Sequence, residues 1–191
     1  YLNGKRNGKG KDYFHNGKLR FEGEYLNGII WNGIGYKIDG SFEFEIKNGT
    51  GNIKEYYDNG HLKFVGKYLS GKRNGKVKEY DYDGELEFEG EYLSGKRNGK
   101  GREYYNGELR FDGEYFYGEK NGNGKEYYNN GQLKYEGEFK NGKIWNGTGF
   151  DIFGIKIFDI KNGNGYIKEY NYDGELEFEG GYLYGKRSGK G

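Results

Sequence analysis

Cysteine, proline and methionine are all absent from the 191 residues of this sequence. The lack of cysteine excludes a disulfide framework, a thiolate metal site and a cysteine nucleophile. No apolar run approaches the roughly 20 residues that a membrane-spanning helix requires, and no segment has the pattern of a signal peptide. The formal net charge is only +1, so bulk electrostatics predict attraction neither to nucleic acid nor to membranes.

Hydrophobic residues are also scarce, at 32% of the chain, and the mean hydropathy of −1.15 is typical of a disordered protein. Two features argue against disorder. Aromatic residues make up 19% and bury a large area each, and proline, which disordered segments favour, is missing. The 39 glycines fit a chain that turns tightly and often, and they disfavour helix throughout. The composition therefore predicts an all-β fold.

Short repeats organise the whole sequence. Most units are about 24 residues long and two are shorter. Each unit starts at the glycine that opens a Gly-x-Gly-like step, and these glycines are Gly8, Gly33, Gly49, Gly75, Gly99, Gly122, Gly147, Gly163 and Gly189. Both ends of the sequence fall within a repeat. We therefore expect one continuous array over residues 1–191, cut from a longer chain.

A block of five hairpins occurs twice in this array. The same order of unit lengths returns after 114 residues, so that Gly8 corresponds to Gly122 and Gly33 to Gly147. The two short units match as well, with residues 33–51 aligned on residues 147–165. This pattern indicates an internal duplication.

Each long unit is interpreted as a β-hairpin. In the unit that starts at Gly122, Lys125–Tyr128 forms the first strand, and Asn130-Gly131 is a two-residue type I′ turn in which both residues tolerate positive φ. The second strand, residues 133–140, alternates apolar or glycine positions with charged ones, which is typical of a strand with one buried face. The same alternation recurs in phase in the other long units.

One hairpin cannot bury its own apolar face, so stacked neighbours must do so. The prediction is an elongated single-sheet array of antiparallel β-hairpins, advancing roughly 10 Å per hairpin, with one aromatic face. The glycine in the third place of each alternating strand leaves a slot for an aromatic ring from the next strand or repeat.

The two short units each follow an Ile-Trp-Asn-Gly segment, at Ile30–Gly33 and at Ile144–Gly147. They lack the second glycine-rich loop. We interpret them as a change of pitch in the array, with Trp31 and Trp145 filling the space that the shorter hairpin leaves. A binding role for the two tryptophans is the alternative.

The segment Phe88–Gly101, FEGEYLSGKRNGKG, resembles the MORN repeat, whose core is Tyr-x-Gly-x-Trp/Phe-x-x-Gly-x-x-x-Gly-x-Gly. Similar cores start at Phe21, Phe64, Phe111, Tyr135 and Phe178, so the resemblance covers essentially the whole chain. The chain is closer to the variant with Asn-Gly turns. It departs from the usual form because tyrosine mostly replaces tryptophan after the Gly-Glu pair and because two units are truncated. The resemblance implies a scaffold that holds partners or associates with itself, sometimes beside a catalytic domain. Phosphoinositide or membrane binding is also a proposed role of the family.

The aromatic face is the first candidate binding surface. Exposed tyrosine and phenylalanine anchor a protein partner well because ordering them costs little entropy. The same side chains are the only core available to such a fold, so mutual packing is the structural alternative. The predicted partner-binding groove, for another protein or a second copy of the chain, comprises Tyr25, Tyr68, Tyr92, Tyr115, Phe139 and Tyr182.

Basic pairs in the loops that close the long hairpins form the second candidate surface. Stacking sets these pairs along one edge, where each basic residue near an anionic membrane contributes about 1 kcal/mol. A solvated edge that discourages strand aggregation is the structural alternative, and nearby glutamates weaken the lipid hypothesis. The predicted basic edge comprises Lys5, Arg6, Lys72, Arg73, Lys96, Arg97, Lys186 and Arg187.

No catalytic constellation is recognisable in the sequence. His15 and His61 occupy turn positions in different units, carboxylates recur in every unit, and the Gly-Lys-Arg-Asn-Gly-Lys segments lack the spacing of a phosphate-binding loop. We therefore predict a non-catalytic scaffold with no cofactor, no metal site and no nucleic-acid partner. Its expected location is the cytoplasm, with membrane or cytoskeletal association as a further option. Asn48 and Asn146 lie in glycosylation sequons, which matter only in an extracellular protein.

Overall fold

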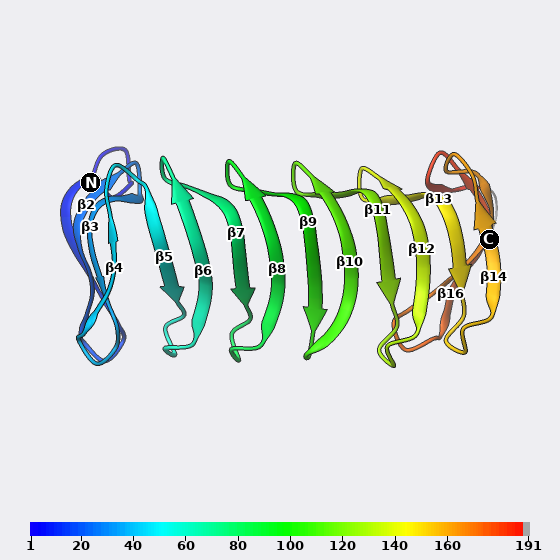
Figure 1. The fold of residues 1–191 in the computed structure, drawn as a ribbon, viewed down its shortest axis with the longest axis horizontal. Coiled ribbons are helices and arrows are strands. Elements are labelled where there is room, and N and C mark those ends of the chain that lie inside the picture. The colour runs from blue at the N-terminus through cyan, green and yellow to red at the C-terminus, as the bar shows by residue number, and fades with distance from the viewer. Residues whose placement is uncertain (189–191) are drawn as a thin grey trace. The chain divides into compact units, whose positions relative to one another are not determined.

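The computed structural model describes residues 1–188, which contain seventeen β-strands and no helix (Figure 1). The all-β class and the array of antiparallel hairpins predicted from the sequence are confirmed. The chain divides into two compact units, Tyr1–Lys96 and Arg97–Gly191. No helix long and apolar enough to cross a membrane occurs in the part of the chain that the structure describes. The repeat start assigned to Gly189 lies outside the described residues.

In the first unit, consecutive strands pair antiparallel from β1 to β4 and again from β5 to β8. These strands are β1 (Gly8–Tyr13), β2 (Leu19–Leu26), β3 (Ile29–Tyr36), β4 (Phe42–Ile46), β5 (Gly51–Tyr56), β6 (Leu62–Leu69), β7 (Lys72–Tyr80) and β8 (Leu86–Leu93).

In the second unit, the same antiparallel pairing runs from β9 to β14 and from β15 to β17. These strands are β9 (Lys96–Tyr105), β10 (Glu108–Phe116), β11 (Glu119–Tyr127), β12 (Leu133–Lys140), β13 (Lys143–Phe150), β14 (Lys156–Ile160), β15 (Gly165–Tyr170), β16 (Leu176–Leu183) and β17 (Lys186–Ser188).

Two kinds of turn join the strands. At ten sites a residue and the glycine that follows it both have positive φ, which is the pattern of a two-residue type I′ turn. These pairs are Asn3-Gly4, Asn27-Gly28, Asn48-Gly49, Ser70-Gly71, Ser94-Gly95, Asn106-Gly107, Tyr117-Gly118, Asn141-Gly142, Asn162-Gly163 and Tyr184-Gly185. We call these ten pairs the tight turns.

The other turns are three-residue loops in which only the last residue, a glycine, has positive φ. At residues 129–131 the Gly131 N–H donates to the Tyr128 carbonyl at 3.0 Å, and Asn130 does not have positive φ. The prediction of a type I′ turn at Asn130-Gly131 is therefore wrong. The extra residue, Asn129, gives the chain room for an ordinary type I turn closed by a left-handed glycine.

Phenylalanine rings lie on glycines of their own strand. A Cβ on Gly113 would lie 2.5 Å from the ring of Phe111, and one on Gly180 would lie 2.9 Å from the ring of Phe178. At these two glycines the slot is filled by the phenylalanine two residues earlier in the same strand, whereas a Cβ on Gly66 would first meet Val77 of the next strand at 2.8 Å. Phe111 also contacts Tyr115 edge-to-face, with 5.4 Å between ring centroids.

Strand pairing is interrupted once in each of the two compact units, and each interruption lies at a short repeat. Among the described residues, β4 and β5 share only the bridge between Lys47 and Thr50, and β14 and β15 share only the bridge between Lys161 and Asn164. The single sheet expected from the sequence therefore breaks at these two points. We call strands β1–β6 with their turns the first corner, and strands β11–β16 with their turns the second corner.

The sheets on either side of each break pack against each other. In the first corner the buried residues of this contact are Phe21, Tyr25, Ile46 and Ile53. A shift of 114 positions gives the residues Tyr135, Phe139, Ile160 and Ile167, which are buried in the second corner. The two copies of the duplicated block therefore build the same core.

The Ile-Trp-Asn-Gly segment holds each corner turn. The carbonyl of Trp31 accepts a hydrogen bond of 2.8 Å from the Gly49 N–H, and the Asn32 side chain accepts one of 2.8 Å from the Asn48 N–H. A Cβ on Gly49 would lie 2.7 Å from the Trp31 ring, so the ring rests directly on the turn. Trp145 and its neighbours repeat these contacts at Gly163. This geometry supports the structural interpretation of the two tryptophans.

Candidate functional site

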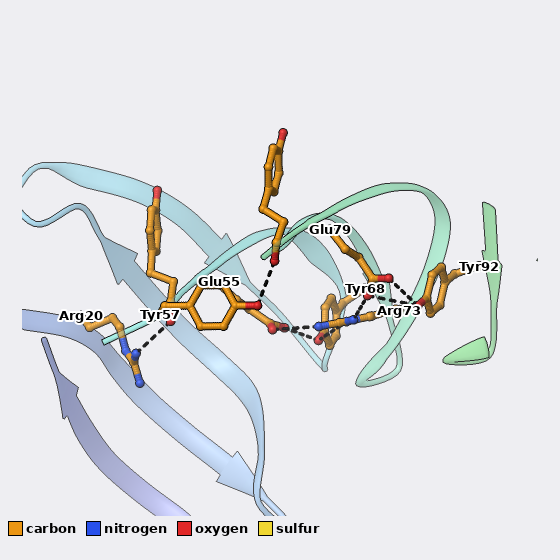
Figure 2. A network of polar contacts seen from close by, with 9 residues as sticks. Arg20, Glu55, Tyr57, Tyr68, Arg73, Glu79 and Tyr92 are labelled. Atoms are coloured by element: carbon orange, nitrogen blue, oxygen red, sulfur yellow. Dashed lines mark hydrogen bonds and ion pairs between the residues drawn. The ribbon is translucent and has the colours of Figure 1, made fainter. Parts of the chain in front are cut away.

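A ladder of tyrosine, glutamate and arginine side chains runs across the first unit (Figure 2). The Tyr68 hydroxyl donates to Glu55, and Arg73 forms ion pairs with Glu55 at 3.0 Å and with Glu79. The Tyr92 hydroxyl then donates to Glu79 at 3.1 Å. The ladder follows from the repeat itself, because successive long repeats place Tyr68 and Tyr92, Glu55 and Glu79, and Arg73 within hydrogen-bond or ion-pair distance.

The electrostatics of the ladder keep its members in their ordinary ionisation states. Burial, reinforced by the Glu55 carboxylate, raises the pKa of Tyr68 above its usual value, so its hydroxyl stays protonated and donates. Burial opposes the charge of Arg73, but the neighbouring carboxylates outweigh it and raise the pKa of the guanidinium. These groups satisfy one another, which makes the ladder a structural network.

The six residues of the predicted partner-binding groove lie on the same face of the sheets as the ladder, and we call this face the inner face. Tyr25, Tyr115 and Phe139 are buried, with at most 6% of their surface exposed. The other three, Tyr68, Tyr92 and Tyr182, are partly buried, and their hydroxyls donate to glutamates. The aromatic face thus serves as the core along most of the array.

Three of the four basic pairs lie in strands rather than in loops, contrary to the expectation from sequence, whereas Lys5-Arg6 precedes β1. Lys72 and Arg73 open β7, so their side chains point to opposite faces of the sheet. Lys72 is exposed, whereas Arg73 reaches inward and stacks on Phe64 with its Cζ 4.0 Å from the ring centroid.

In the other basic pairs, too, the lysine is exposed and the arginine has an ion-pair partner. Arg97 pairs with Glu103 at 2.7 Å, and Arg187 stacks on Phe178 at 4.7 Å while pairing with Glu169. Arg6 pairs with Asp12 at 3.1 Å. The lysines of these pairs, Lys5, Lys96 and Lys186, are exposed. The arginines of the predicted basic edge thus all have ion-pair partners, and Arg6 and Arg187 are exposed together with the four lysines.

A cleft opens in each corner where the two sheets meet. The first has a volume of about 410 Å³ and the second a volume of about 290 Å³. Tyr25 and Tyr68 line the first cleft, and Phe139 and Tyr182 line the second. The corners thus bring together four of the predicted groove residues, while Tyr92 lines neither cleft.

Most residues that line the two clefts correspond under the 114-position shift, but the rims differ in charge and polarity. Ile29 in the first cleft stands where Lys143 does in the second. Lys63 in the first cleft stands where Glu177 does in the second. The duplication therefore preserved the shape-determining aromatic residues and changed the groups that meet solvent.

An acidic residue in the first cleft is held between two arginines. The Asp12 carboxylate accepts from Arg20 at 2.6 Å and from Arg6 at 3.1 Å. Burial alone would raise the pKa of Asp12, but the two guanidinium groups outweigh it and hold the pKa below its usual value. Arg20 also donates to the Tyr56 carbonyl at 3.4 Å, which ties β2 to β5 across the corner.

The second corner has a contact that sequence analysis missed. The turn between β15 and β16, residues 171–174, crosses to the turn between β11 and β12 (Figure 1). The Asn129 N–H donates to the Tyr172 carbonyl at 2.9 Å, and the Asn129 side chain donates to Asp173. The Tyr172 ring lies against two cations, with the Lys134 Nζ at 4.4 Å and the Arg110 Cζ at 5.2 Å from its centroid. We call residues 171–174 the closing turn.

Exposed apolar side chains at the tight turns were also missed. Each stands directly before the turn, with Leu69 exposed by 47% and Leu93 by 54%. Leu26, Phe116 and Leu183 occupy the same place and are exposed too. The signal was present in the sequence, since these residues break the strict alternation at the strand ends.

The two histidines lie in turns and are exposed, as expected. The His61 Nδ1 lies 3.1 Å from the Tyr82 carbonyl, and the two residues belong to neighbouring hairpins. Within residues 1–188, no group of three or more histidine, aspartate or glutamate side chains is arranged to hold a metal ion.

Comparison with known families identifies repeats over much of the chain. A family model for the MORN repeat variant matches residues 6–27, 49–69, 73–93 and 120–141. A model for the MORN repeat matches residues 88–108 and 178–191. Together the two models cover more than half of the sequence. A comparison with curated proteins found no match.

Proposed function

Because the chain belongs to the MORN repeat family, a non-catalytic family whose repeats generally mediate interactions with proteins or membranes, we propose that it is a scaffold that binds a protein partner through the cleft of the first corner, the larger of the two. The observation that carries this proposal is the concentration of aromatic groove residues and charged groups in the two clefts. Elsewhere the aromatic face is packed as core, so it offers a partner little depth. The clefts combine apolar walls with a few convergent polar groups, the usual composition of a binding site.

The rim of the first cleft offers a mild way to test this proposal. Ile29→Lys together with Lys63→Glu converts the rim into that of the second cleft, whose own Lys143 and Glu177 demonstrate that these residues suit the fold. Both positions are exposed, so the variant should fold normally. A partner cross-linked to the wild-type chain should be lost from this variant by at least about tenfold, or 1.4 kcal/mol.

A matched control changes exposed lysines outside the clefts. Lys72→Glu with Lys96→Glu alters two exposed lysines that line neither cleft. The partner should be captured equally well by this control and by the wild type. If the rim variant captures the partner as well as the wild type does, or if only the lysine control loses it, the partner does not bind at the cleft.

Membrane docking through the tight turns is the second candidate function, and a specific observation favours it. The exposed leucines before these turns stand beside exposed lysines, as Leu69 does beside Lys72 and Leu93 beside Lys96. Apolar tips with flanking lysines suit the interface of an anionic bilayer. Co-sedimentation with vesicles of anionic phospholipid at about 0.15 M salt tests it. Binding that falls in Lys72→Glu with Lys96→Glu, but not in the rim variant, would favour the membrane over the protein partner.

A further inference from the structure

At most of the tight turns, the glycine amide is held by an earlier repeat. The Gly28 N–H donates to the Arg6 carbonyl at 2.8 Å, and the Gly142 N–H donates to the Lys120 carbonyl at 2.9 Å. The glycines with a bond of this kind are Gly28, Gly49, Gly71, Gly95, Gly118, Gly142, Gly163 and Gly185. Each of these turns is therefore tied to a repeat that precedes it.

A second hydrogen bond holds the residue before the glycine. The Asn27 N–H donates to the Asn7 side chain at 3.2 Å, and the Asn141 N–H donates to the Asn121 side chain at 3.3 Å. Together with the glycine bond it fixes both central amides of the turn, and we call this pair of bonds the turn clamp. The asparagine-glycine turns with a complete clamp are Asn27-Gly28, Asn48-Gly49, Asn141-Gly142 and Asn162-Gly163.

Asn106-Gly107 is an asparagine-glycine tight turn without this clamp. It joins β9 to β10, at the same end of the strands as the longer loop between β11 and β12 (Figure 1). No acceptor for the Asn106 or Gly107 N–H occurs among residues 1–188. Asn3-Gly4 also lacks the clamp within these residues, but no complete repeat precedes it in the sequence. Asn106-Gly107 is thus an unclamped turn that lies inside the array.

The hairpin that follows does not hold this turn either. The loop between β11 and β12 is linked to the next loop, because the Asn130 side chain donates to the Ile152 carbonyl at 3.1 Å. The Asn106 side chain makes no hydrogen bond within the described part of the chain, and both Asn106 and Gly107 are exposed. Local opening should therefore cost less at this turn than at a clamped one.

An asparagine that is followed by glycine is chemically labile. The glycine nitrogen attacks the Cγ of the asparagine side chain, so that a C–N bond forms and the side-chain amide leaves as ammonia with the proton of the glycine nitrogen. Water then adds to either carbonyl of the resulting succinimide ring and opens it, which gives aspartate or isoaspartate. Glycine favours the attack because it has no Cβ to obstruct it. The reaction consumes no reagent other than water.

The turn clamp opposes this reaction in two ways. Its glycine bond stabilises the N–H that must lose a proton, and both bonds hold the backbone in the type I′ conformation, whereas the attack requires rotation about the asparagine Cα–C bond. A hydrogen bond of this kind is expected to slow the reaction by about threefold to tenfold. Asn27, Asn141 and Asn106 are all exposed, so hydrogen bonds and not access to water distinguish them.

We propose that Asn106 is a site of spontaneous deamidation in the folded chain, while the clamped asparagines are protected. Conversion to aspartate adds a negative charge and keeps the turn, because aspartate also adopts the left-handed conformation. Conversion to isoaspartate adds a carbon to the backbone of a two-residue turn and disturbs the pairing of Tyr105 with Glu108. The hairpin of β9 and β10 therefore ages faster than the hairpins whose asparagine turns are clamped.

Incubation of the full chain at mildly alkaline pH, followed by digestion and mass spectrometry, measures deamidation at each asparagine. Asn27 and Asn141 are matched controls, because they have the same exposure class and the same following residue. Asn106 should react at least about threefold faster than either one in the folded chain, and the three rates should converge in denaturing urea. Equal rates in the folded chain would overturn the proposal, as would an equally large difference in urea, which would trace it to the local sequence.

Two variants test the clamp itself. Asn121→Ala removes the acceptor of the Asn141 N–H and should accelerate deamidation at Asn141 by about threefold. Asn74→Ala removes the equivalent acceptor of the Ser94 N–H and is the control, which should leave the Asn141 rate unchanged. No acceleration in Asn121→Ala, or equal acceleration in both variants, would contradict protection by the clamp.

A third variant, Asn106→Ser, places at this turn the residue type that Ser70 and Ser94 contribute to other tight turns. It should fold normally and remove the reaction at this site. After prolonged incubation, the Tyr105 and Glu108 amides should exchange faster in the wild type than in this variant, because isoaspartate loosens the turn. Equal exchange in the two aged proteins would contradict the expected loosening of the hairpin.

Discussion

The two corners are built from the same duplicated block, yet one is closed and the other open. Both have the tryptophan that rests on the corner turn, the buried residues between the sheets and the break in strand pairing. They differ in the turn that follows the short repeat. In the second corner this turn carries Tyr172 and docks on Asn129, whereas in the first corner Asp58 stands in its place.

This difference separates what builds a corner from what occupies it. The glycines, tryptophans and asparagines of the corner satisfy backbone groups and allow close approach, so they determine the backbone path. A single tyrosine and its hydrogen-bond partner distinguish the docked turn of the second corner from the undocked turn of the first. The first cleft has a volume of about 410 Å³ and the second a volume of about 290 Å³.

The largest expected effect tests the shared core. A Cβ on Gly35 would lie 2.3 Å from the Phe44 ring, and a Cβ on Gly149 would lie 2.1 Å from the Phe158 ring. Gly35→Ala and Gly149→Ala should each destabilise the fold by about 2–3 kcal/mol, because a packed ring must move. Urea unfolding measures both. Ile34→Ala, at an exposed neighbouring position, is the control and should cost less than about 1 kcal/mol. Values for the two glycines that differ by more than about 1 kcal/mol would contradict the equivalence of the cores.

The next effect concerns the closing turn. Tyr172→Asp removes the aromatic face from Lys134 and Arg110 and should destabilise the second corner by about 1–2 kcal/mol. Asp58→Ala, the matched change in the first corner, should alter the free energy of unfolding by less than about 0.5 kcal/mol. Thermal or urea unfolding of both variants distinguishes these outcomes. Equal losses would mean that Tyr172 contributes no more than an ordinary surface residue.

A smaller effect is expected from acid. The pKa of Asp12 is lowered in the folded state, so its contribution is present above the ordinary aspartate pKa of 3.8 and is lost as the pH falls through the folded value. The ion pairs with Arg20 and Arg6 are partly exposed and should contribute about 0.5–1 kcal/mol. Asp12→Asn should therefore reduce stability at pH 6, and the difference from the wild type should shrink as the pH falls below 3.8 and through the lowered pKa of Asp12 in the folded state. A constant difference across this range would assign the effect to packing instead of charge.

The smallest effect on stability should come from exchanging the rims. Lys63→Glu together with Glu177→Lys swaps two exposed side chains and should change the unfolding free energy by less than about 0.5 kcal/mol. Capture of a protein partner at the first cleft should weaken by about threefold to tenfold, because a lysine at its rim becomes a glutamate. Unchanged binding would place Lys63 outside the recognition surface.

Much of the fold was predictable because the repeat encodes it several times. The alternation in residues 133–140 identifies both the strand and its buried face, and the block that returns after 114 residues predicts two equivalent regions. Turn type was less predictable, since Asn-Gly occurs both in two-residue turns such as Asn141-Gly142 and at the end of the three-residue loop at Gly131. What differs is the number of residues between the paired strand ends, which the sequence does not state.

The candidate site was only partly predictable. Tyrosines such as Tyr68 were identified as one face, but their burial depends on the glutamates and arginines that pair with their hydroxyls. The inward position of Arg73 follows from strand alternation once its segment is known to be a strand. The contact of the closing turn was not predictable from the sequence. Tyr172 reaches Asn129 because strand pairing breaks between β14 and β15, and the sequence pattern does not show where that break directs the chain.

The most direct test of the difference between the corners is amide hydrogen exchange at two equivalent positions, Asn129 and His15. The Asn129 N–H is bonded to the Tyr172 carbonyl at 2.9 Å, and the His15 N–H has no acceptor among residues 1–188. The account predicts that Asn129 exchanges at least about tenfold more slowly than His15, after correction for intrinsic rates, and that Tyr172→Asp abolishes the difference. Equal protection of the two amides in the wild type would show that the corners are alike, and would contradict the account.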